Sequence, residues 1–326
     1  MHRVCLQATC GLSYRMLALP VIVLLALVPI RASAADAEAM CFAGTGKPRI
    51  DVVMCSMALM PAGPLSRATL LTKRARARIE LAEDERALKD LGQALAINPL
   101  SVAALTEKGR ALRFLGRPKE ARNALSEAIR VGPNVPRPRR IRGVLALTVG
   151  DYAAAISDLS WVIKTSPGRG ASHALRGIAH YYLDDPQAAL ADFEEAKARD
   201  FGYAYLPLWI ALAQERLGKE SEQGLQAARA ALLDEGDWPA PVIDMYRDPT
   251  TEAMETALKL ADKGTPRLQR ARVGQIHFLR GELHRLRDAP DKALTSFATA
   301  VRHGDPRTVE FALARQRLAA AKKQSN

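Results

Sequence analysis

Small and large apolar residues recur between Ala68 and Tyr203 at a fixed step of 34 residues. Five columns carry the pattern: Ala87, Ala121, Ala155 and Ala189; Leu91, Leu125, Leu159 and Phe193; Ala94, Ala128, Val162 and Ala196; Ala75, Gly109, Gly143 and Gly177; Pro99, Pro133, Pro167 and Phe201. Each unit holds two apolar runs of helix length, divided by a turn at Gly116, Gly150-Asp151 or Asp184-Asp185. The pattern therefore predicts tandem helix–turn–helix repeats.

The columns also predict how the two helices of a unit pack. Small residues let the helices approach closely, and the large residue fills the remaining space. Proline cannot continue a helix, so the last column ends the second helix of a unit. The regular units span 68–101, 102–135, 136–169 and 170–203. The expected fold is all-α, a right-handed α-solenoid.

This pattern resembles the tetratricopeptide repeat (TPR) motif, which requires small residues at three places and a proline near the end of each unit. Gly109, Ala121, Ala128 and Pro133 fill those places in one unit, and the next has Gly143, Ala155 and Pro167. The resemblance implies a superhelix that binds protein partners in its concave groove.

The rest of the chain is less regular. Residues 204–237 keep the helical rhythm around Gly218, and a proline-rich break from Trp238 begins a degenerate unit that runs to about Gly264. A clean unit returns at 274–307, followed by a charged helix to Lys323. The expected division is 1–34, a signal peptide; 35–65, an N-terminal cap; 66–203, four regular repeats; 204–264, a degenerate region; and 265–326, a final repeat with a capping helix.

Residues 1–34 have the features of a secretory signal peptide. Arg3 and Arg15 precede an apolar run from Met16 to Ile30, and Ala32-Ser33-Ala34 forms a cleavage site. An uncleaved anchor is the alternative, but 15 residues fall short of the ~20 that a spanning helix needs. We expect a periplasmic or secreted protein with no membrane span after cleavage. It would not be a lipoprotein, because Glu38-Ala39-Met40 before Cys41 is not a lipid-attachment box.

Two cysteines, Cys41 and Cys55, remain after removal of that segment. An even number of cysteines in an oxidising compartment favours a disulfide, and this one would close a 15-residue loop. It would fasten the N-terminal cap, where Arg49–Met60 is predicted as a helix. A reactive thiol is the alternative.

The chain carries a formal charge of +12, and loss of Arg3, Arg15 and Arg31 would leave 44 basic and 35 acidic residues, or +9. Such an excess favours acidic partners, including anionic peptides, a membrane surface or cell-wall polymer. A generally arginine-rich, solvated surface is the plainer alternative. No aromatic stacking surface or binding motif indicates nucleic acid.

The sequence contains no constellation typical of an enzyme. His173 and His180 lie seven residues apart, as do His277 and His284, and both pairs occupy helix-packing columns. Gly44-Thr45-Gly46-Lys47 lacks the spacing of a phosphate loop, and Pro48 stands where the magnesium-binding hydroxyl would be. We expect no catalytic residue, cofactor or metal. A secreted hydrolase or a small-ligand-binding protein is the alternative class.

The first helices of the units are expected to line the concave groove. The predicted partner-binding residues are Arg76, Arg110, Arg113, Phe114, Arg140, Leu147, Tyr181 and Tyr182. This groove would be cationic at its N-terminal end and apolar-aromatic further on, and would suit a segment with acidic and apolar residues. The leading hypothesis is a non-enzymatic adaptor or scaffold.

The C-terminal part resembles the new-lipoprotein-I class of Gram-negative envelope TPR adaptors. The matching residues are Trp238, Pro239, Val242, Ile243, Tyr246, Glu252 and Glu255, although the lipid-bearing cysteine is missing. The resemblance implies that envelope proteases or peptidoglycan enzymes are the partners. Trp238 and Tyr246 also raise the alternative of a dimer face.

Overall fold

The computed structural model describes residues 33–168, 170–199, 202–232 and 238–324. The described residues form helices and contain no strand. The helices are α1 (Ala34–Ala43), α2 (Pro48–Ala58), α3 (Pro64–Glu80), α4 (Asp84–Ile97), α5 (Val102–Phe114), α6 (Pro118–Val131), α7 (Pro136–Val149), α8 (Tyr152–Thr165), α9 (Gly170–Tyr182), α10 (Pro186–Ala198), α11 (Leu206–Arg216), α12 (Glu222–Ala230), α13 (Ala240–Arg247), α14 (Thr251–Ala261), α15 (Pro266–Leu286), α16 (Pro290–His303) and α17 (Val309–Gln324).

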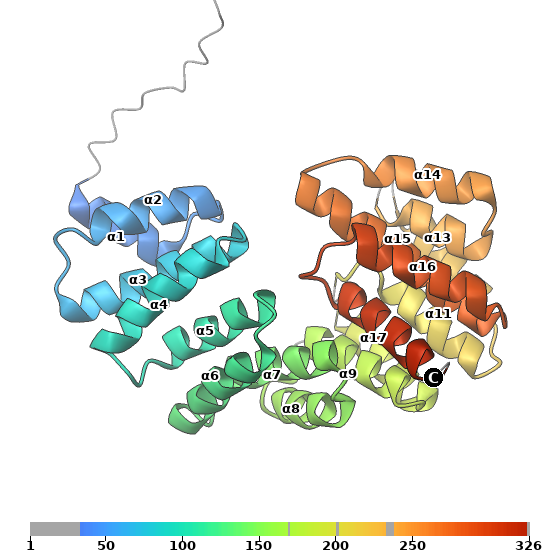
Figure 1. Ribbon diagram of the computed structural model, residues 1–326, viewed down its shortest axis with the longest axis horizontal. Coiled ribbons are helices and arrows are strands. Elements are labelled where there is room, and N and C mark those ends of the chain that lie inside the picture. Colours follow the sequence, from blue (N-terminus) through green and yellow to red (C-terminus); the bar gives the residue numbers. More distant parts are fainter. Residues whose placement is uncertain (1–32, 169, 200–201, 233–237, 325–326) are drawn as a thin grey trace, which may run out of the picture.

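Consecutive helices pack as antiparallel hairpins that follow one another along a curved array, which confirms the predicted all-α solenoid (Figure 1). The turns of the regular units lie where the sequence predicts them, around Gly116, Gly150 and Asp184-Asp185. Helices α4, α6 and α8 end two residues before Pro99, Pro133 and Pro167, as expected from a residue that cannot continue a helix.

Glycine lets the two helices of a hairpin approach closely. A Cβ added to Gly109 in α5 would lie 2.5 Å from Cγ of Leu125 in α6. The same substitution at Gly177 in α9 would place Cβ 2.7 Å from Cε1 of Phe193 in α10. Leu125 and Phe193 are fully buried. The small and large columns are thus the two sides of one packing contact.

A second set of periodic residues joins hairpins through buried charge. Arg142 of α7 donates two hydrogen bonds to the carboxylate of Asp158 in α8, from Nε at 2.7 Å and from Nη2 at 2.8 Å. Arg74 with Asp90, and Arg176 with Asp192, repeat this geometry in α3–α4 and α9–α10. In each case the third guanidinium nitrogen reaches a serine hydroxyl of the preceding hairpin. These arginines connect successive units, and sequence analysis did not recognise them.

The first hairpin is fastened by the predicted disulfide. Cys41 of α1 and Cys55 of α2 are bonded, which confirms that pairing, and both side chains are buried. The predicted signal peptide lies almost wholly outside the described residues. Across those that are described, no helix has both the length and the apolar content that crossing a bilayer requires.

The two ends of the array lie opposite each other. Helices α1 to α6 form one arm, α7 to α9 the base, and α11 to α17 the other arm (Figure 1). The second arm is thicker because one apolar core runs through it, built around Trp209, whose ring centroid lies 5.7 Å from that of Tyr181 and 5.7 Å from that of Phe278. Helix α17 folds back from this arm and packs on α7.

Candidate binding groove

The C-terminal part of the concave face is covered by the chain's own last helix. Gln316 of α17 donates a hydrogen bond from Nε2 to the carbonyl oxygen of Leu147 at 2.9 Å, and accepts one from the hydroxyl of Tyr152. The side chains of Leu147 and Tyr181 have no exposed surface. This part of the groove is therefore interior.

A buried glutamate holds α15 and α17 against α9. Glu282 of α15 is fully buried and accepts hydrogen bonds from the hydroxyls of Tyr182 at 3.0 Å and Tyr181 at 3.2 Å. Arg317 of α17 donates to the same carboxylate from Nε at 2.8 Å, and Arg285 does so at 3.0 Å. Each donor satisfies part of a charge that would otherwise be costly to bury.

These contacts correct part of the predicted groove. Leu147, Tyr181 and Tyr182 were expected to contact a partner, but they contact α15 and α17 instead. The repeat pattern placed them correctly on the concave side. It could not indicate that a helix more than 100 residues further along the chain covers that side.

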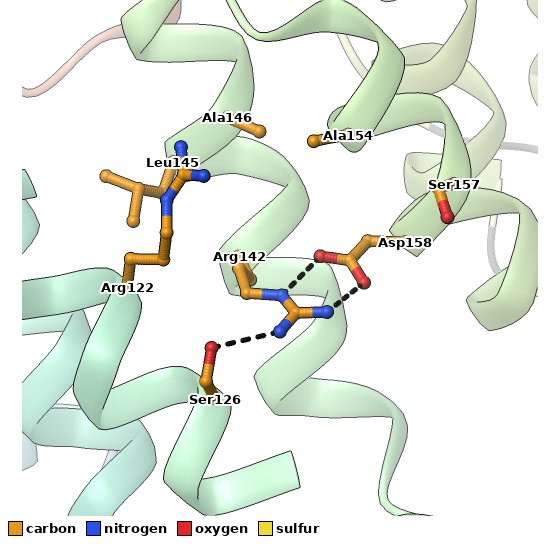
Figure 2. A pocket seen from close by; sticks show the side chains of 8 residues that line it. All are labelled: Arg122, Ser126, Arg142, Leu145, Ala146, Ala154, Ser157 and Asp158. Carbon is orange, nitrogen blue, oxygen red and sulfur yellow. Dashed lines mark hydrogen bonds and ion pairs between the residues drawn. The ribbon is translucent and has the colours of Figure 1, made fainter. Parts of the chain in front are cut away.

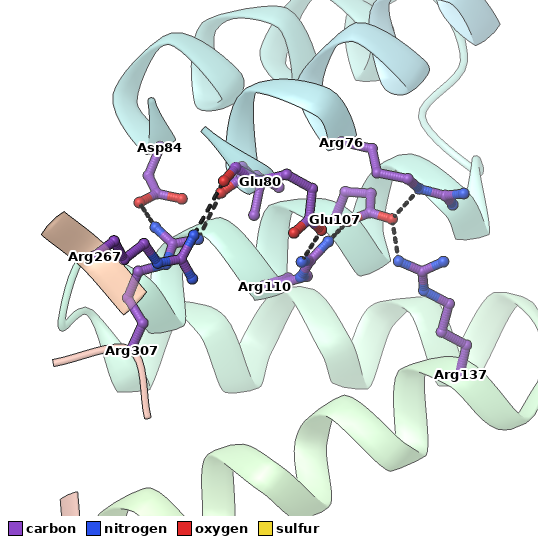
Figure 3. A network of polar contacts seen from close by, with 9 residues as sticks. Arg76, Glu80, Asp84, Glu107, Arg110, Arg137, Arg267 and Arg307 are labelled. Carbon is purple, nitrogen blue, oxygen red and sulfur yellow. Dashed lines mark hydrogen bonds and ion pairs between the residues drawn. The ribbon is translucent and has the colours of Figure 1, made fainter. Parts of the chain in front are cut away.

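The two arms also meet at the end of α3. Arg307, in the loop after α16, donates to Asp84 and to the carbonyl oxygen of Ile79, the latter at 2.7 Å (Figure 3). Arg267 of α15 donates to the carbonyl oxygen of Glu80 at 3.1 Å. Both cations thus lie at a helix C-terminus, where the unpaired carbonyl groups favour positive charge. The guanidinium carbon of Arg307 also lies 3.5 Å from the ring centroid of Phe114.

The N-terminal part of the concave face remains open. A pocket of about 400 Å³ lies between α3, α5 and α7. We call it the basic pocket; its lining residues are Arg76, Glu80, Arg110, Arg113, Arg137, Arg140, Ile141 and Val144. It contains four of the predicted partner-binding residues, and adds Arg137. Phe114 lies beside it, stacked between the guanidinium groups of Arg113 and Arg307.

One buried carboxylate holds three of these arginines in place. Glu107 of α5 is fully buried and accepts hydrogen bonds from Nε of Arg76 at 2.8 Å, from Arg110 at 3.4 Å, and from Arg137 (Figure 3). Arg110 also donates to Glu80. The pocket lining thus holds five arginines, and Glu80 and Glu107 are the carboxylates that bond to three of them.

The electrostatic environment differs among these arginines. Burial by itself lowers the pKa of Arg110, but its hydrogen bond to Glu80 and the charge of Glu107 more than offset this and raise it. Burial lowers the pKa of Arg137, partly against the charge of Glu107, and Arg76 and Arg110 lower it further. Burial likewise lowers the pKa of Arg113, to about 10, and Arg110 and Arg307 contribute in the same direction.

A second cavity, of about 160 Å³, lies between α6, α7 and α8 (Figure 2). Its polar wall includes Arg122, which is paired with Asp151, and Arg142, whose guanidinium is already bonded to Asp158 and Ser126. The cavity lies beside the Arg142–Asp158 contact within one hairpin and the Arg142–Ser126 contact to the preceding hairpin. Its strongest donors are engaged, so it is a structural feature rather than a ligand site.

Of Trp238 and Tyr246, the two residues predicted for a possible dimer or partner face, only Tyr246 is buried. Tyr246 is 2% exposed and lies in the core of the second arm. Trp238 is partly buried, donates from its indole nitrogen to the hydroxyl of Tyr205, and lies under the guanidinium of Arg272.

Within the described ranges no group of three His, Cys, Asp or Glu side chains could hold a metal ion.

Fold and groove together define an α-solenoid of tandem helix hairpins with a partly filled concave face. The tetratricopeptide repeat family model matches residues 72–136, 106–169 and 142–203. Residues 72–203 thus consist of tetratricopeptide repeats, and the family match covers the regular units.

Solved structures share the fold. A tetratricopeptide repeat protein from Parabacteroides merdae ATCC 43184 superposes with a TM-score of 0.52 and 15% identity, covering 88% of this chain and 97% of its own. The APC/C hetero-tetramer Cut9-Hcn1 gives a TM-score of 0.54 and 13% identity, covering 88% of this chain and 48% of the other. No curated protein matches the sequence. At these identities the likeness concerns the fold alone.

Proposed function

We propose that this protein is a non-enzymatic scaffold that binds an acidic segment of a partner protein in the basic pocket. The observation that carries this proposal is the position of the pocket. The rest of the concave face described above is covered by α15 and α17, whereas the pocket between α3, α5 and α7 is open and has excess positive charge. Ile141 and Val144 supply an apolar wall for a neighbouring side chain.

Arginine is suited to this task because its planar guanidinium binds a carboxylate through two parallel hydrogen bonds. Glu107 holds three of the guanidinium groups in position before a ligand arrives. A rigid arrangement loses less conformational entropy on binding than mobile lysines would. The pocket therefore favours an acidic segment with at least one apolar residue.

We further propose that the protein acts in the periplasm or is secreted. Support comes from the features of residues 1–34 and from the disulfide between Cys41 and Cys55, which needs an oxidising compartment. Cleavage after Ala34 would remove Ser33, whose hydroxyl caps α1 by accepting a hydrogen bond from Asp36. The disulfide would then hold the shortened α1. Cell fractionation with N-terminal sequencing should find a mature chain that begins at Ala35; retention of residues 1–34 would refute cleavage.

The resemblance to the new-lipoprotein-I class suggests envelope proteases or peptidoglycan enzymes as partners, and this remains a proposal from sequence alone. The binding proposal is tested by cross-linking the protein in its native envelope and identifying partners by mass spectrometry. The same experiment is repeated with Arg110→Ala and with the exposed Arg86→Ala as a control. The pocket assignment predicts loss of partners for Arg110→Ala only; an unchanged partner set would refute it.

A further inference from the structure

The arginines of the basic pocket are not equivalent. Arg76, Arg110 and Arg137 share the buried carboxylate of Glu107, and Arg110 also reaches Glu80. Their charges are balanced in the free protein by hydrogen bonds within the groove wall. A ligand that bound these three groups would have to compete with Glu107 for them.

Arg113 differs from its neighbours because it has no carboxylate of its own. Within the described part of the chain it makes no hydrogen bond and no ion pair, and its Nε is buried without a partner. Its guanidinium carbon lies 4.0 Å from the ring centroid of Phe114, and this stacking is its one strong local contact. Asp84, whose negative charge acts on Arg113, is bonded to Arg307.

A cation in this position is costly to keep. Arg113 is half-buried, so part of its guanidinium is withdrawn from water without a partner, and an arriving opposite charge would offset this cost. Arg113 remains protonated at neutral pH because the pKa of an arginine lies far above 7, even after burial lowers it to about 10. The free protein therefore carries an uncompensated positive charge on the wall of an open pocket.

We propose that Arg113 is the anchoring subsite of the basic pocket, and that it binds the carboxylate of one aspartate or glutamate side chain of the partner. This inference rests on the proposed function and specifies the chemistry of its ligand. A single guanidinium presents two parallel donors, which match one carboxylate. Phosphate groups are typically bound by clusters of arginines, and here Glu107 engages the neighbouring arginines.

Replacing Arg113 should raise the stability of the free protein and, at the same time, weaken its binding to an acidic peptide. Replacing Arg113 with glutamine removes the uncompensated charge, so the free protein should unfold at a higher temperature. Replacing Arg110 with glutamine removes a donor from Glu80 and Glu107, so that variant should unfold at a lower temperature. Both variants should bind an acidic peptide less well. A purely structural role for Arg113 would make Arg113→Gln less stable.

The test uses the full mature chain and a fluorescein-labelled peptide in which glutamate and leucine alternate, read by fluorescence anisotropy. The glutamine analogue of the peptide and a phosphoserine-for-glutamate version form the other arms. The control variant is Arg117→Gln, an exposed arginine of the same repeat unit that pairs with Glu120 outside the pocket. Arg113→Lys serves as a second variant, which keeps the charge but loses the two parallel donors.

The expected result is that the wild type binds the glutamate peptide and Arg113→Gln weakens binding about tenfold or more, as loss of a charged hydrogen bond predicts. Arg113→Gln should also melt at a higher temperature, Arg113→Lys should bind with intermediate affinity, and Arg117→Gln should match the wild type. Unchanged affinity or a lower melting temperature for Arg113→Gln would overturn the subsite while leaving the proposed function intact. If the wild type bound the phosphoserine peptide more tightly than the glutamate peptide, the group that Arg113 binds would be a phosphate and not a carboxylate. Failure of the wild type to bind either acidic peptide would overturn the proposed function itself.

Discussion

Arg307 and Asp84 form a buried ion pair across 223 residues of sequence, and this pair joins the two arms of the solenoid. Their side chains are 9% and 8% exposed. Arg307 lies in the loop between α16 and α17, and Asp84 begins α4. The pair borders the basic pocket through Phe114, on which Arg307 stacks. Closure of the arms and the shape of the pocket are therefore linked.

Replacing Arg307 with alanine should destabilise this closure strongly. The change leaves the buried carboxylate of Asp84 without its cation, and breaking one half of a buried pair typically costs about 3–5 kcal/mol. Denaturant unfolding of the variant measures the loss. Arg86→Ala, which removes an exposed arginine paired with Glu83, should change stability by less than about 1 kcal/mol. Equal stability of the two variants would show that the arms do not depend on this pair.

Stability should fall at acidic pH through Glu282. Burial alone raises the pKa of Glu282, but the charges and hydrogen bonds of Arg317 and Arg285 more than offset this and hold it below the ordinary value of 4.5. The unfolded chain then binds a proton at a higher pH than the folded chain does. The stabilisation is complete above pH 4.5 and is lost as pH falls through the lower folded value.

The Glu282→Gln variant tests this pH dependence. It should lose about 3–5 kcal/mol at neutral pH, because Arg317 and Arg285 lose their counter-charge. It should also show a shallower decline of stability below pH 4.5 than the wild type. Glu85→Gln, at an exposed position of α4, should keep the wild-type slope. Parallel stability curves for the wild type and Glu282→Gln would contradict the prediction.

Two helical glycines, Gly177 in the small-residue column and Gly92 outside it, should respond oppositely to replacement by alanine. An alanine Cβ at Gly177 would lie 2.8 Å from Cδ1 of Phe193 and 3.1 Å from the backbone oxygen of Ala189, so overpacking should cost about 1–3 kcal/mol. At Gly92, in the interior of α4, an added Cβ meets nothing within 4 Å. Gly92→Ala should therefore gain about 0.5–1 kcal/mol from its higher helix propensity. Thermal unfolding distinguishes the two, and a stabilised Gly177→Ala would refute the close approach.

Loss of the disulfide should weaken the first hairpin. The bond joins cysteines separated by 14 residues, and removal of such a cross-link typically costs about 3 kcal/mol in the chain-entropy account. The double variant Cys41→Ala with Cys55→Ala should show this loss in denaturant unfolding. Reductant should destabilise the wild type and leave the double variant unchanged. A reductant effect of equal size on both proteins would point to a cause other than this bond.

The hairpins could be predicted from sequence because their contacts are local and recur every 34 residues. Gly177 and Phe193, for example, belong to one unit and meet wherever that unit folds. The arginine–aspartate contacts follow the same spacing, with Arg142 and Arg176 in one column and Asp158 and Asp192 in another. A search of polar columns would have found them.

The filled groove could not be predicted in the same way. Tyr181 meets Glu282 across 101 residues, and Gln316 meets Leu147 across 169. Such contacts depend on the accumulated curvature of the array and on the irregular region between the arms. Neither quantity is encoded in the repeat columns. The basic end of the groove was found because the first helices of consecutive units place Arg76 and Arg110 side by side.

Partners should bind in the basic pocket and not along the whole concave face. Photo-cross-linking with a benzophenone-bearing peptide of alternating glutamate and leucine tests this most directly, with sites mapped by mass spectrometry. Cross-links should fall on α3, α5 and α7, around Arg76, Arg113 and Val144. Cross-links concentrated on α9, α15 or α17 would show that the C-terminal helix leaves the groove for a partner, and would contradict the claim.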